Sequence, residues 1–321
     1  EMEKRRLGNS DIEITPIIMG TWQAGKRWWV GIEDGDTVKA IRAAYDAGIT
    51  TVDTAEVYGD GHSEQIVAQA LHNVRDKVVY ATKVFVNHLK YDQVIEACDR
   101  SLENLKTDYI DLYQIHWPSG SFNNEKVPIA ETMQALNDLK QQGKIRAIGV
   151  SNFSRVQLEE ASRCGRIDSL QPPYSLFWRY VEKDAMPYCI ENNISILAYS
   201  PLAQGLLTGK FGKGHQFESG DNRADNKLFK GENYERAQIA LEKLRPIAQR
   251  HQTTLANLAL AWLIAQPQTC AIAGFRHAEQ AADNALAAQV HLSADELAEI
   301  DAIGCIVTDH LDNSPIMWEW S

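Results

Sequence analysis

The feature that most constrains the fold is a regular alternation of short apolar segments with longer amphipathic ones. Segments with β-strand character recur at Ile17–Gly20, Thr51–Asp53, Val78–Thr82, Ile110–Gln114, Ala147–Ser151, Ser169–Gln171, Ser195–Tyr199 and Thr269–Ala273. Stretches with helical spacing lie between them, for example Asp36–Ala47, Tyr91–Leu105, Ile129–Gln142, Ser154–Cys164 and Asp184–Asn192. Because strand and helix alternate about eight times, the sequence predicts an α/β protein with a closed (β/α)8 fold, a TIM barrel.

Several segments depart from the plain repeat. Two alternating runs around Gly8-Asn9 predict an N-terminal β-hairpin. The glycine-rich run Gly205–Glu232 has little apolar periodicity and predicts a long, mobile loop. Further helices are expected at Tyr234–His251, at Leu255–Ala265 and near Ser293–Ile303, where Ser293 and Glu296 fit a capping box. No linker divides the repeat, so we expect residues 1–321 to form a single domain.

Charge and composition exclude some classes of function. The 321-residue chain has a formal net charge of -11, which argues against binding to nucleic acid or to an anionic membrane. It has neither the apolar core of a signal peptide nor an apolar run of about 20 residues that could span a membrane. Its five scattered cysteines form no CxxC pair, and His62 and Glu64 have no third partner at a spacing that suits a metal. We therefore expect a reduced, cytoplasmic protein without a metal site.

Residues with chemical capacity stand where the predicted strands end. Asp53 ends the second strand, Lys83 follows the third and His116 follows the fourth, while Tyr58 lies in a loop closed by glycines. The carboxyl ends of barrel strands share one rim, so these side chains should converge there. A buried Lys83 needs a carboxylate, which Asp53 can provide, and its ammonium should lower the pKa of a neighbouring Tyr58. His116 can donate a hydrogen bond to a substrate oxygen. Ser63 is expected to cap the next helix.

Each of these residues also has an ordinary structural explanation. Asp53 could cap a turn and Tyr58 could be a half-buried loop residue. Lys83 could extend its ammonium to the surface, and His116 could be a hydrogen-bonded histidine ahead of the turn at Pro118. The position of all four at one rim favours a catalytic site.

Aromatic residues cluster near the same strand ends. They suggest an aromatic substrate pocket, although core packing explains any one of them about as well. Trp22 and Trp117 are the leading candidates for substrate contact. The full set is Trp22, Trp28, Trp29, Phe85, Trp117, Phe177 and Trp178.

These motifs resemble those of the aldo-keto reductase superfamily over nearly the whole chain. The segment Asp53-Thr-Ala-Glu-Val-Tyr-Gly59 resembles its Asp/Tyr signature, Ala81-Thr-Lys83 its lysine strand, and Asp111-Leu-Tyr-Gln-Ile-His-Trp117 its histidine strand. The segments 148–153 (IGVSNF) and 198–210 (AYSPLAQGLLTGK) also match. The last motif and the loop behind it are most similar to the bacterial general reductases and the voltage-gated potassium-channel β subunits.

The resemblance implies a reaction and four catalytic roles. In this family NADPH delivers a hydride to an aldehyde or ketone. Tyr58 would be the general acid that protonates the resulting alkoxide, with Lys83 and Asp53 tuning it and His116 orienting the carbonyl.

The resemblance also implies a cofactor site. No GxGxxG motif follows a strand, so the barrel itself must hold the dinucleotide. The nicotinamide would be held by Ser151, Asn152 and Gln171, stacked on Tyr199 and bordered by Gly20, Thr21 and Trp22. The pyrophosphate would follow Ser200, Leu202, Gln204 and Gly205, with Lys210 and Arg223 on the loop that covers it. The adenosine end would involve Gly274, Arg276, Gln280 and Asn284, and many members carry Lys or Arg and Glu where this chain has Gln280 and Asp283.

The turn after the last strand makes a specific prediction about the cofactor. Gly274 allows the backbone to approach a ligand, and a helix begins near Ala278 with free amides at its first turn. Arg276, between them, has a forked set of donors suited to phosphate oxygens. We therefore expect Arg276 to bind the 2′-phosphate and the protein to prefer NADPH to NADH.

Two other functions remain open from the sequence. The protein could be a cofactor-bound sensor or auxiliary subunit with slow turnover, or a lyase or aldolase in which Lys83 forms a Schiff base. The expected partner is a small carbonyl substrate, and a monomer is the default because no oligomeric interface is indicated.

Overall fold

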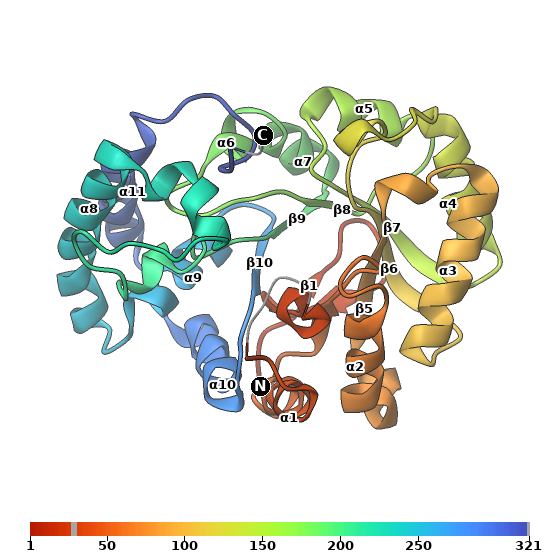
Figure 1. Ribbon diagram of the computed structural model, residues 1–321, viewed down its shortest axis with the longest axis horizontal. Coiled ribbons are helices and arrows are strands. Elements are labelled where there is room, and N and C mark those ends of the chain that lie inside the picture. Colours follow the sequence, from red (N-terminus) through yellow and green to blue (C-terminus); the bar gives the residue numbers. More distant parts are fainter. Residues whose placement is uncertain (27–30, 320–321) are drawn as a thin grey trace.

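Eight parallel strands close into a barrel in the computed structural model, which describes residues 1–26 and 31–319 (Figure 1). The barrel strands are β3 (Ile17–Gly20), β4 (Thr51–Asp53), β5 (Val79–Val84), β6 (Ile110–Ile115), β7 (Ile145–Ser151), β8 (Ser169–Gln171), β9 (Ser195–Ala198) and β10 (Thr269–Ala273). They follow one another in chain order around the barrel, which closes where β10 pairs with both β9 and β3. The predicted (β/α)8 barrel is confirmed, and the strands deviate from their predicted ranges by at most two residues at either end.

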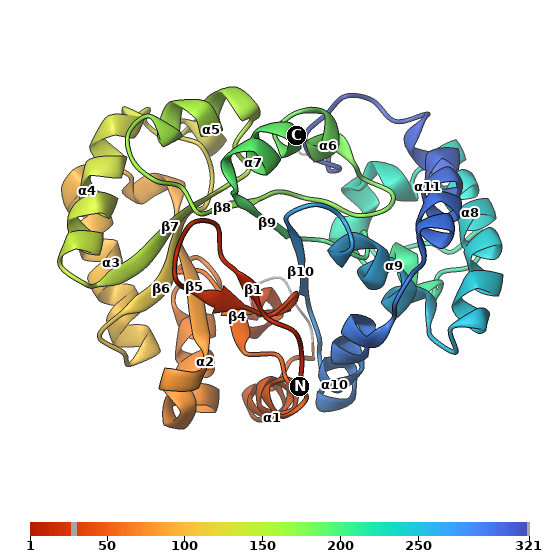
Figure 2. The same cartoon turned by 180° about the vertical axis from the view of Figure 1, so that it is seen from behind.

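Helices surround the barrel in both views (Figures 1 and 2). They are α1 (Asp34–Asp46), α2 (His62–Leu71), α3 (Tyr91–Leu105), α4 (Ile129–Gln141), α5 (Arg155–Ser162), α6 (Tyr180–Lys183), α7 (Met186–Asn192), α8 (Gly231–Arg250), α9 (Leu255–Ile264), α10 (Ala278–Leu286) and α11 (Ala294–Thr308). The predicted extra helix between β9 and β10 is confirmed, since α8 and α9 both lie there. The capping box of Ser293 and Glu296 is also present at the start of α11. No helix in the described ranges has the length and apolar character needed to cross a membrane.

The N-terminal hairpin closes the end of the barrel where the strands begin. Its strands β1 (Arg5–Arg6) and β2 (Glu13–Ile14) pair antiparallel, as predicted. The hairpin binds the first residues of barrel strands: the Gly8 amide donates to Ser195 Oγ at 2.8 Å, and Arg5 donates to the Thr269 carbonyl at 2.7 Å. Figure 2 shows this side, with the hairpin in front of the strands. Apolar side chains of the hairpin pack on the barrel interior and cover this end of the barrel.

The interior of the barrel changes from apolar to polar along the strands. Alternate residues of a strand point to the same face, so residues two apart on each strand stack into layers inside the barrel. The layer next to the hairpin is apolar and contains Ile18, Ala81, Leu112, Ala147, Leu197 and Ile272. Two residues further along β5 and β6 stand Lys83 and Gln114, which are both fully buried. Lys83 and Gln114 therefore bring polar groups into the interior near the carboxyl ends of the strands.

The long segment between β9 and α8 is more structured than predicted. It contains 3-10 turns at Leu206–Thr208, Asn222–Asp225 and Lys227–Phe229. The ring centroids of Phe211 and Phe217 are 5.1 Å apart, those of Phe217 and Phe229 are 5.0 Å apart, and the Arg223 guanidinium lies 4.8 Å from the Phe217 ring. The rings therefore form a small apolar cluster within the loop, which its lack of apolar periodicity did not indicate.

The C-terminal tail binds this loop. Trp318 Nε1 donates to Gln204 Oε1 at 2.9 Å, and the same oxygen accepts a bond from Asn226 Nδ2 at 2.8 Å. The Lys227 amide donates to the Met317 carbonyl at 2.8 Å. Gln204 thus joins the turn after β9, the long loop and the tail.

The barrel wall at Gly149 provides a test of the interior packing. A Cβ at this position would lie 2.2 Å from Ser169 Oγ and 3.1 Å from Gln114 Cγ. Overpacking of this kind costs about 1–3 kcal/mol, so Gly149→Ala should lower the free energy of unfolding by that amount in urea titration.

Two further variants serve as controls for this prediction. Adding Ser169→Gly to Gly149→Ala should restore part of the stability, because it removes the nearest clash. Gly35→Ala on α1, where a Cβ meets nothing within 4 Å, should not destabilise the protein. Equal stability of Gly149→Ala and wild type would contradict the packing described.

Candidate active site

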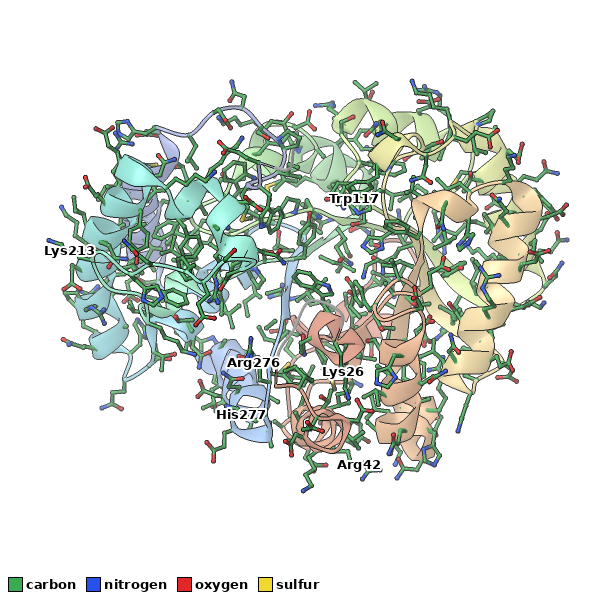
Figure 3. All side chains as sticks on the ribbon, in the orientation of Figure 1. Lys26, Arg42, Trp117, Lys213, Arg276 and His277 are labelled. Carbon is green, nitrogen blue, oxygen red and sulfur yellow. The ribbon has the colours of Figure 1, made fainter. Side chains whose placement is uncertain are left out.

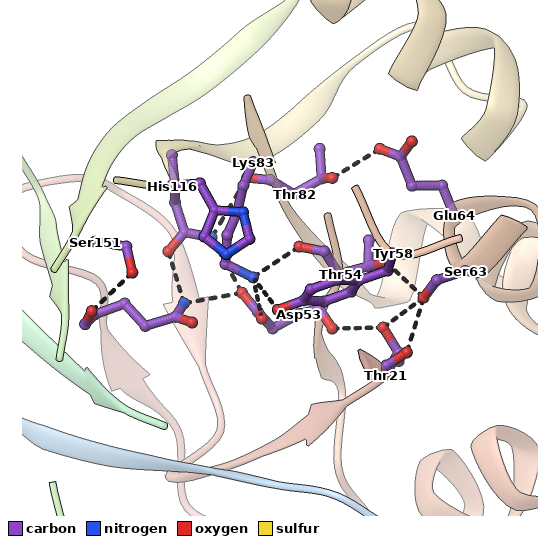
Figure 4. Close-up of polar contacts among 12 residues, drawn as sticks. Thr21, Asp53, Thr54, Tyr58, Ser63, Glu64, Thr82, Lys83, His116 and Ser151 are labelled. Carbon is purple, nitrogen blue, oxygen red and sulfur yellow. Dashed lines mark hydrogen bonds and ion pairs between the residues drawn. The ribbon is translucent and has the colours of Figure 1, made fainter. Parts of the chain in front are cut away.

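An ion pair inside the barrel lies at the centre of the candidate site. Lys83 Nζ is 2.6 Å from Asp53 Oδ2, and the two side chains are 0% and 4% exposed. The same nitrogen lies 2.9 Å from the Thr54 carbonyl oxygen and 3.2 Å from the Tyr58 phenolic oxygen, as Figure 4 shows. Burial acts to lower the pKa of Lys83, but the charges of Asp53 and Tyr58 and their hydrogen bonds together outweigh burial, so the net pKa is raised. The predicted pair exists, and all three ammonium hydrogens have acceptors.

Tyr58 reaches Lys83 from the loop after β4. Two glycines let this loop pack against the 3-10 turn at Trp22–Gly25: a Cβ on Gly25 would lie 2.6 Å from the Tyr58 carbonyl carbon, and one on Gly59 would lie 2.3 Å from the Gly25 oxygen. Gly59 also has a φ of 65°, which favours glycine. The backbone that carries the phenol is therefore held by a contact that no larger residue allows.

The pKa of Tyr58 differs from the sequence-based expectation. Burial raises it above the ordinary value, and the charge of Lys83 and its hydrogen bond only partly oppose this effect. The prediction of a lowered net pKa is wrong, although Lys83 acts in the predicted direction. At neutral pH the phenol consequently keeps its proton and can donate it.

His116 borders the phenol at the end of β6. Its ring is edge-on to Tyr58, with centroids 5.9 Å apart, and edge-on to Phe85 at 5.4 Å. Burial, and then the charge of Lys83, lower its pKa well below the ordinary value, so the imidazole is neutral near pH 7. Its buried Nδ1 bonds no group in the described parts of the chain. A neutral ring that retains hydrogen-bonding capacity beside a phenol suits the orientation of a polar ligand.

The sequence analysis missed Gln114, which also binds Asp53. Gln114 Nε2 lies 3.1 Å from Asp53 Oδ1, and Gln171 Nε2 lies 3.0 Å from the same oxygen. These residues come from β4, β6 and β8, strands that are not neighbours and can meet only across the barrel interior. The signal that could have found Gln114 is its position two residues before His116, on the inward face of the same strand.

The residues assigned to the nicotinamide are brought together by hydrogen bonds. Ser151 Oγ donates to the Gln171 carbonyl at 2.8 Å, and the Tyr199 hydroxyl donates to Asn152 Oδ1 at 2.6 Å. Asn152 Nδ2 in turn donates to the His116 carbonyl at 3.1 Å. Tyr199 stacks on Trp318 with the ring planes 10° apart. The structure therefore joins these predicted cofactor residues to the backbone of His116.

Residues after β3 support the same rim from the other side. Gly20 ends β3, Thr21 Oγ1 donates to the Asp53 carbonyl at 2.8 Å, and Trp22 is 37% exposed. Ser63 Oγ donates to Thr21 (Figure 4) and makes no cap, since α2 starts after Gly61 without a side-chain cap. The prediction that Ser63 caps a helix is wrong because its hydroxyl instead joins the first turn of α2 to Thr21, just after β3.

The residues expected along the pyrophosphate lie in the turns after β9. Ser200, Gln204 and Gly205 have φ values of 50°, 56° and 89°, and Leu202 lies between them. Further along, Lys210 is exposed. Arg223 instead binds Asp221, with an Arg223 Nη2 to Asp221 Oδ2 distance of 2.6 Å.

The residues expected at the adenosine end form the turn after β10. Gln280 Oε1 accepts a bond from the Arg276 amide at 2.7 Å, and Asn284 Nδ2 donates to the Gly274 carbonyl at 3.0 Å. Their amides thus brace the turn that carries Arg276, which Figure 3 shows at the start of α10. Bonds from Arg223 and, more weakly, the charge of Arg276 hold the pKa of Asp221 below its ordinary value. The long loop and Arg276 therefore lie near one another.

Two of the predicted aromatic residues, Phe85 and Trp117, belong to one group of rings. Phe122 stacks on Phe85 with centroids 6.2 Å apart and meets Trp117 edge-on at 4.9 Å, so three rings form a wall next to His116. Phe122 is 52% exposed and was not predicted. Phe177 and Trp178 are 0% and 1% exposed and belong to the core, so their assignment to the pocket was wrong. Trp28 and Trp29 lie outside the described residues.

No group of three His, Cys, Asp or Glu side chains that could hold a metal ion occurs within residues 1–26 and 31–319. The groups that the site does offer are the proton of Tyr58, the charge of Lys83 and the hydrogen-bonding groups around them.

Comparison with known proteins gives a consistent result. The sequence profile of the Aldo/keto reductase family matches residues 16–304. The NADH-specific methylglyoxal reductase of Escherichia coli is 35% identical over 314 residues, which cover 91% of this chain and 95% of that protein.

Solved structures agree with the sequence match. The glycerol dehydrogenase AKR11B4 from Gluconobacter oxydans superposes with a TM-score of 0.88 at 33% identity and covers 97% of this chain and 98% of its own. An aldo-keto reductase from Klebsiella pneumoniae in complex with NADPH superposes with a TM-score of 0.77 at 29% identity over 100% of both chains.

The ion pair at the centre of the site predicts a large effect on stability. Lys83→Met leaves the Asp53 carboxylate buried without its cation, which should lower the free energy of unfolding by about 3–5 kcal/mol in urea titration. The pKa of Lys83 is higher in the folded protein than in the unfolded chain. Its contribution to the free energy of unfolding is therefore complete below the pKa of an ordinary lysine, and is lost only as the pH rises through the folded pKa. The effect should therefore be constant between pH 6 and 9.

Lys90→Met is the matched control, because the Lys90 side chain is 49% exposed and its pair with Glu125 lies at the surface. Loss of this surface pair should lower the free energy of unfolding by less than about 1 kcal/mol. If the two variants unfolded at the same urea concentration, Lys83 would not form a buried pair.

Proposed function

Since the chain belongs to the aldo/keto reductase family, we propose that it reduces aldehydes or ketones to alcohols with a nicotinamide cofactor, preferentially NADPH. The observation that carries this proposal is the contact between a buried ammonium and a protonated phenol, Lys83 Nζ to Tyr58 oxygen, at 3.2 Å. That contact provides an acid whose conjugate base is stabilised in place.

Tyr58 serves as the general acid. A bound nicotinamide would supply the hydride that the carbonyl carbon accepts, and the phenol of Tyr58 gives its proton to the carbonyl oxygen. The phenolate that remains lies next to the Lys83 ammonium, which Asp53 holds in position and keeps charged. Since the ammonium is already in place, little reorganisation is needed when the charge develops.

His116 orients the carbonyl. Its low pKa makes it a neutral donor rather than a competing acid, so the proton comes from Tyr58. The edge-on packing of its ring against Tyr58 and Phe85 restricts the direction of its ring nitrogens.

The same geometry disfavours Schiff-base chemistry at Lys83. An amine must lose its proton to attack a carbonyl, but the pKa of Lys83 is raised and its three hydrogens are bound by Asp53, Thr54 and Tyr58. We therefore retain carbonyl reduction in preference to a lyase or aldolase.

The residues at the rim fit a nicotinamide dinucleotide. The Asn152 amide accepts a bond from the Tyr199 hydroxyl, and the Gln171 amide donates to Asp53; we propose that these two residues and the Tyr199 ring hold the carboxamide and the nicotinamide ring. Gly205 and its neighbours form tight turns in front of the long loop, and we propose that this loop, with Lys210 and Arg223, covers the pyrophosphate. The loop is tied to the tail through Gln204, so it is already folded near this position.

The preference for NADPH is supported by Arg276 and by the NADPH complex of the Klebsiella pneumoniae relative. The Escherichia coli relative is NADH-specific, so family membership alone does not decide the preference. Arg276 stands at the start of α10, where helix amides and the dipole also favour a phosphate.

The substrate is proposed to be a small carbonyl compound. The wall of Phe85, Trp117 and Phe122 offers apolar contact on one side of His116. The relatives include a methylglyoxal reductase and a glycerol dehydrogenase, which act on small oxygenated molecules. A panel of small aldehydes and ketones, followed by the loss of NADPH absorbance, tests the reaction directly.

The role of Tyr58 predicts the effect of its hydroxyl. Tyr58→Phe keeps the shape of the side chain but removes the proton donor, so kcat should fall by roughly 10²-fold or more while cofactor affinity is retained. Tyr45→Phe, on the outer helix α1, should leave kcat unchanged. Turnover of Tyr58→Phe close to wild type would rule out Tyr58 as the acid. Failure of the wild type to reduce any carbonyl would favour a cofactor-bound sensor.

The role of Arg276 predicts a selective loss of affinity. One charge-assisted contact to the phosphate corresponds to a change of about 10- to 100-fold in binding affinity. Arg276→Ala should therefore weaken NADPH binding by that factor and leave NADH binding nearly unchanged. Quenching of tryptophan fluorescence at fixed salt measures both cofactors. Arg250→Ala, which removes an equally exposed cation on α8, is the control. An equal loss for both cofactors would mean that Arg276 acts only through the shape of the turn.

A further inference from the structure

We propose that Gln114 is a positioning residue that connects Asp53 to Gln171 and fixes which atom of the Gln171 amide faces the nicotinamide carboxamide. This inference rests on the proposed use of a nicotinamide cofactor. It assigns a function to a residue that the motif comparison left unused.

The contacts of Gln114 form a chain across the barrel. Its side chain is fully buried, its Nε2 donates to Asp53 Oδ1 at 3.1 Å, and its Oε1 accepts a bond from Gln171 Nε2 at 2.9 Å. Gln171 Nε2 also donates to Asp53 Oδ1, at 3.0 Å. Asp53, Gln114 and Gln171 therefore form a closed triangle of three hydrogen bonds.

The charge of Asp53 determines the direction of every bond in this triangle. A carboxylate that is paired with Lys83 only accepts hydrogen bonds, so both amides must turn their nitrogen atoms toward Asp53 Oδ1. Gln171 then uses its second N–H on Gln114 Oε1. Reversing the Gln171 amide would place its oxygen against two other acceptors in a buried site, which is strongly unfavourable.

The triangle leaves one atom of Gln171 for a ligand. Both of its N–H groups are used, and no donor in the described parts of the chain bonds its Oε1. A primary carboxamide carries an NH2 group that needs such an acceptor. Gln114 thus holds Gln171 in the orientation that suits this group, and it does so from the carboxylate that also holds Lys83.

Three variants test the proposal through binding, without turnover. Gln114→Met has a similar shape but removes the side-chain bonds to Asp53, Gln171 and the Thr82 carbonyl, so affinity for NADPH and NADH should fall by about 10-fold at every pH. Gln114→Glu is the sharper test. When protonated, the introduced carboxyl can donate to Asp53 and accept from Gln171, as the amide does. When ionised, it can only accept, and it repels Asp53.

The affinity of Gln114→Glu should therefore be near that of wild type at pH 5 and fall by 10-fold or more by pH 9. The ratio of the cofactor affinity of Gln114→Met to that of wild type should stay constant between pH 5 and pH 9. Gln266→Met, which removes an amide bond to the Trp262 carbonyl after α9, is the matched control and should bind as wild type does. Affinities come from quenching of tryptophan fluorescence, and melting temperatures are recorded for each variant.

The outcomes separate this proposal from the proposed function. If Gln114→Met and Gln114→Glu lowered the melting temperature but bound cofactor like wild type at all pH values, Gln114 would be structural and the proposal would be wrong. Should Gln114→Met fail to fold, the pH dependence of Gln114→Glu still decides. A wild type that binds NADPH but reduces no carbonyl would overturn the proposed reaction and leave this test intact.

Discussion

The cost of burying Lys83 determines the arrangement of the whole rim. An ammonium with no exposed surface is stable only where a carboxylate and further acceptors surround it, and Asp53, Thr54 and Tyr58 provide them. Asp53 in turn needs donors for its second oxygen, which come from β6 and β8. One charge thereby fixes the side chains of four strands, and the phenol is held at the only remaining position next to the ammonium.

The closed barrel makes this arrangement possible because it separates two environments. The hairpin and the apolar layer next to it cover one end, and the polar layer lies toward the other, at the carboxyl ends of the strands. The same burial that raises the pKa of Tyr58 keeps its proton available at neutral pH. A site open at both ends would solvate Lys83 and weaken its effect on the phenol.

The sequence predicts the features that depend on local pattern, and it does not predict the side-chain contacts that form across the barrel. The strands, the hairpin and the positions of Asp53, Lys83 and His116 follow from periodicity and chain order. Gln114 was missed because its importance depends on facing Gln171 of β8, and Phe122 because a left-handed turn (φ 56°) brings it beside Trp117. Ser63 was misassigned because the sequence does not tell whether a serine near a helix start caps that helix or bonds another segment. Trp178 was misassigned because the sequence does not tell whether an aromatic ring lines a pocket or lies in the core.

The aromatic wall has a consequence for how such a protein can diversify. Phe85 and Trp117 follow the ends of β5 and β6, and the half-exposed Phe122 lies further out in a loop, whereas Asp53 and Lys83 lie within strands and are buried. Replacing Phe122 touches no hydrogen bond of the ion pair and changes no strand register. The chain therefore separates an exposed ring in a loop from a buried chemical centre in the strands, so single loop substitutions can change ligand contacts without disturbing the fold.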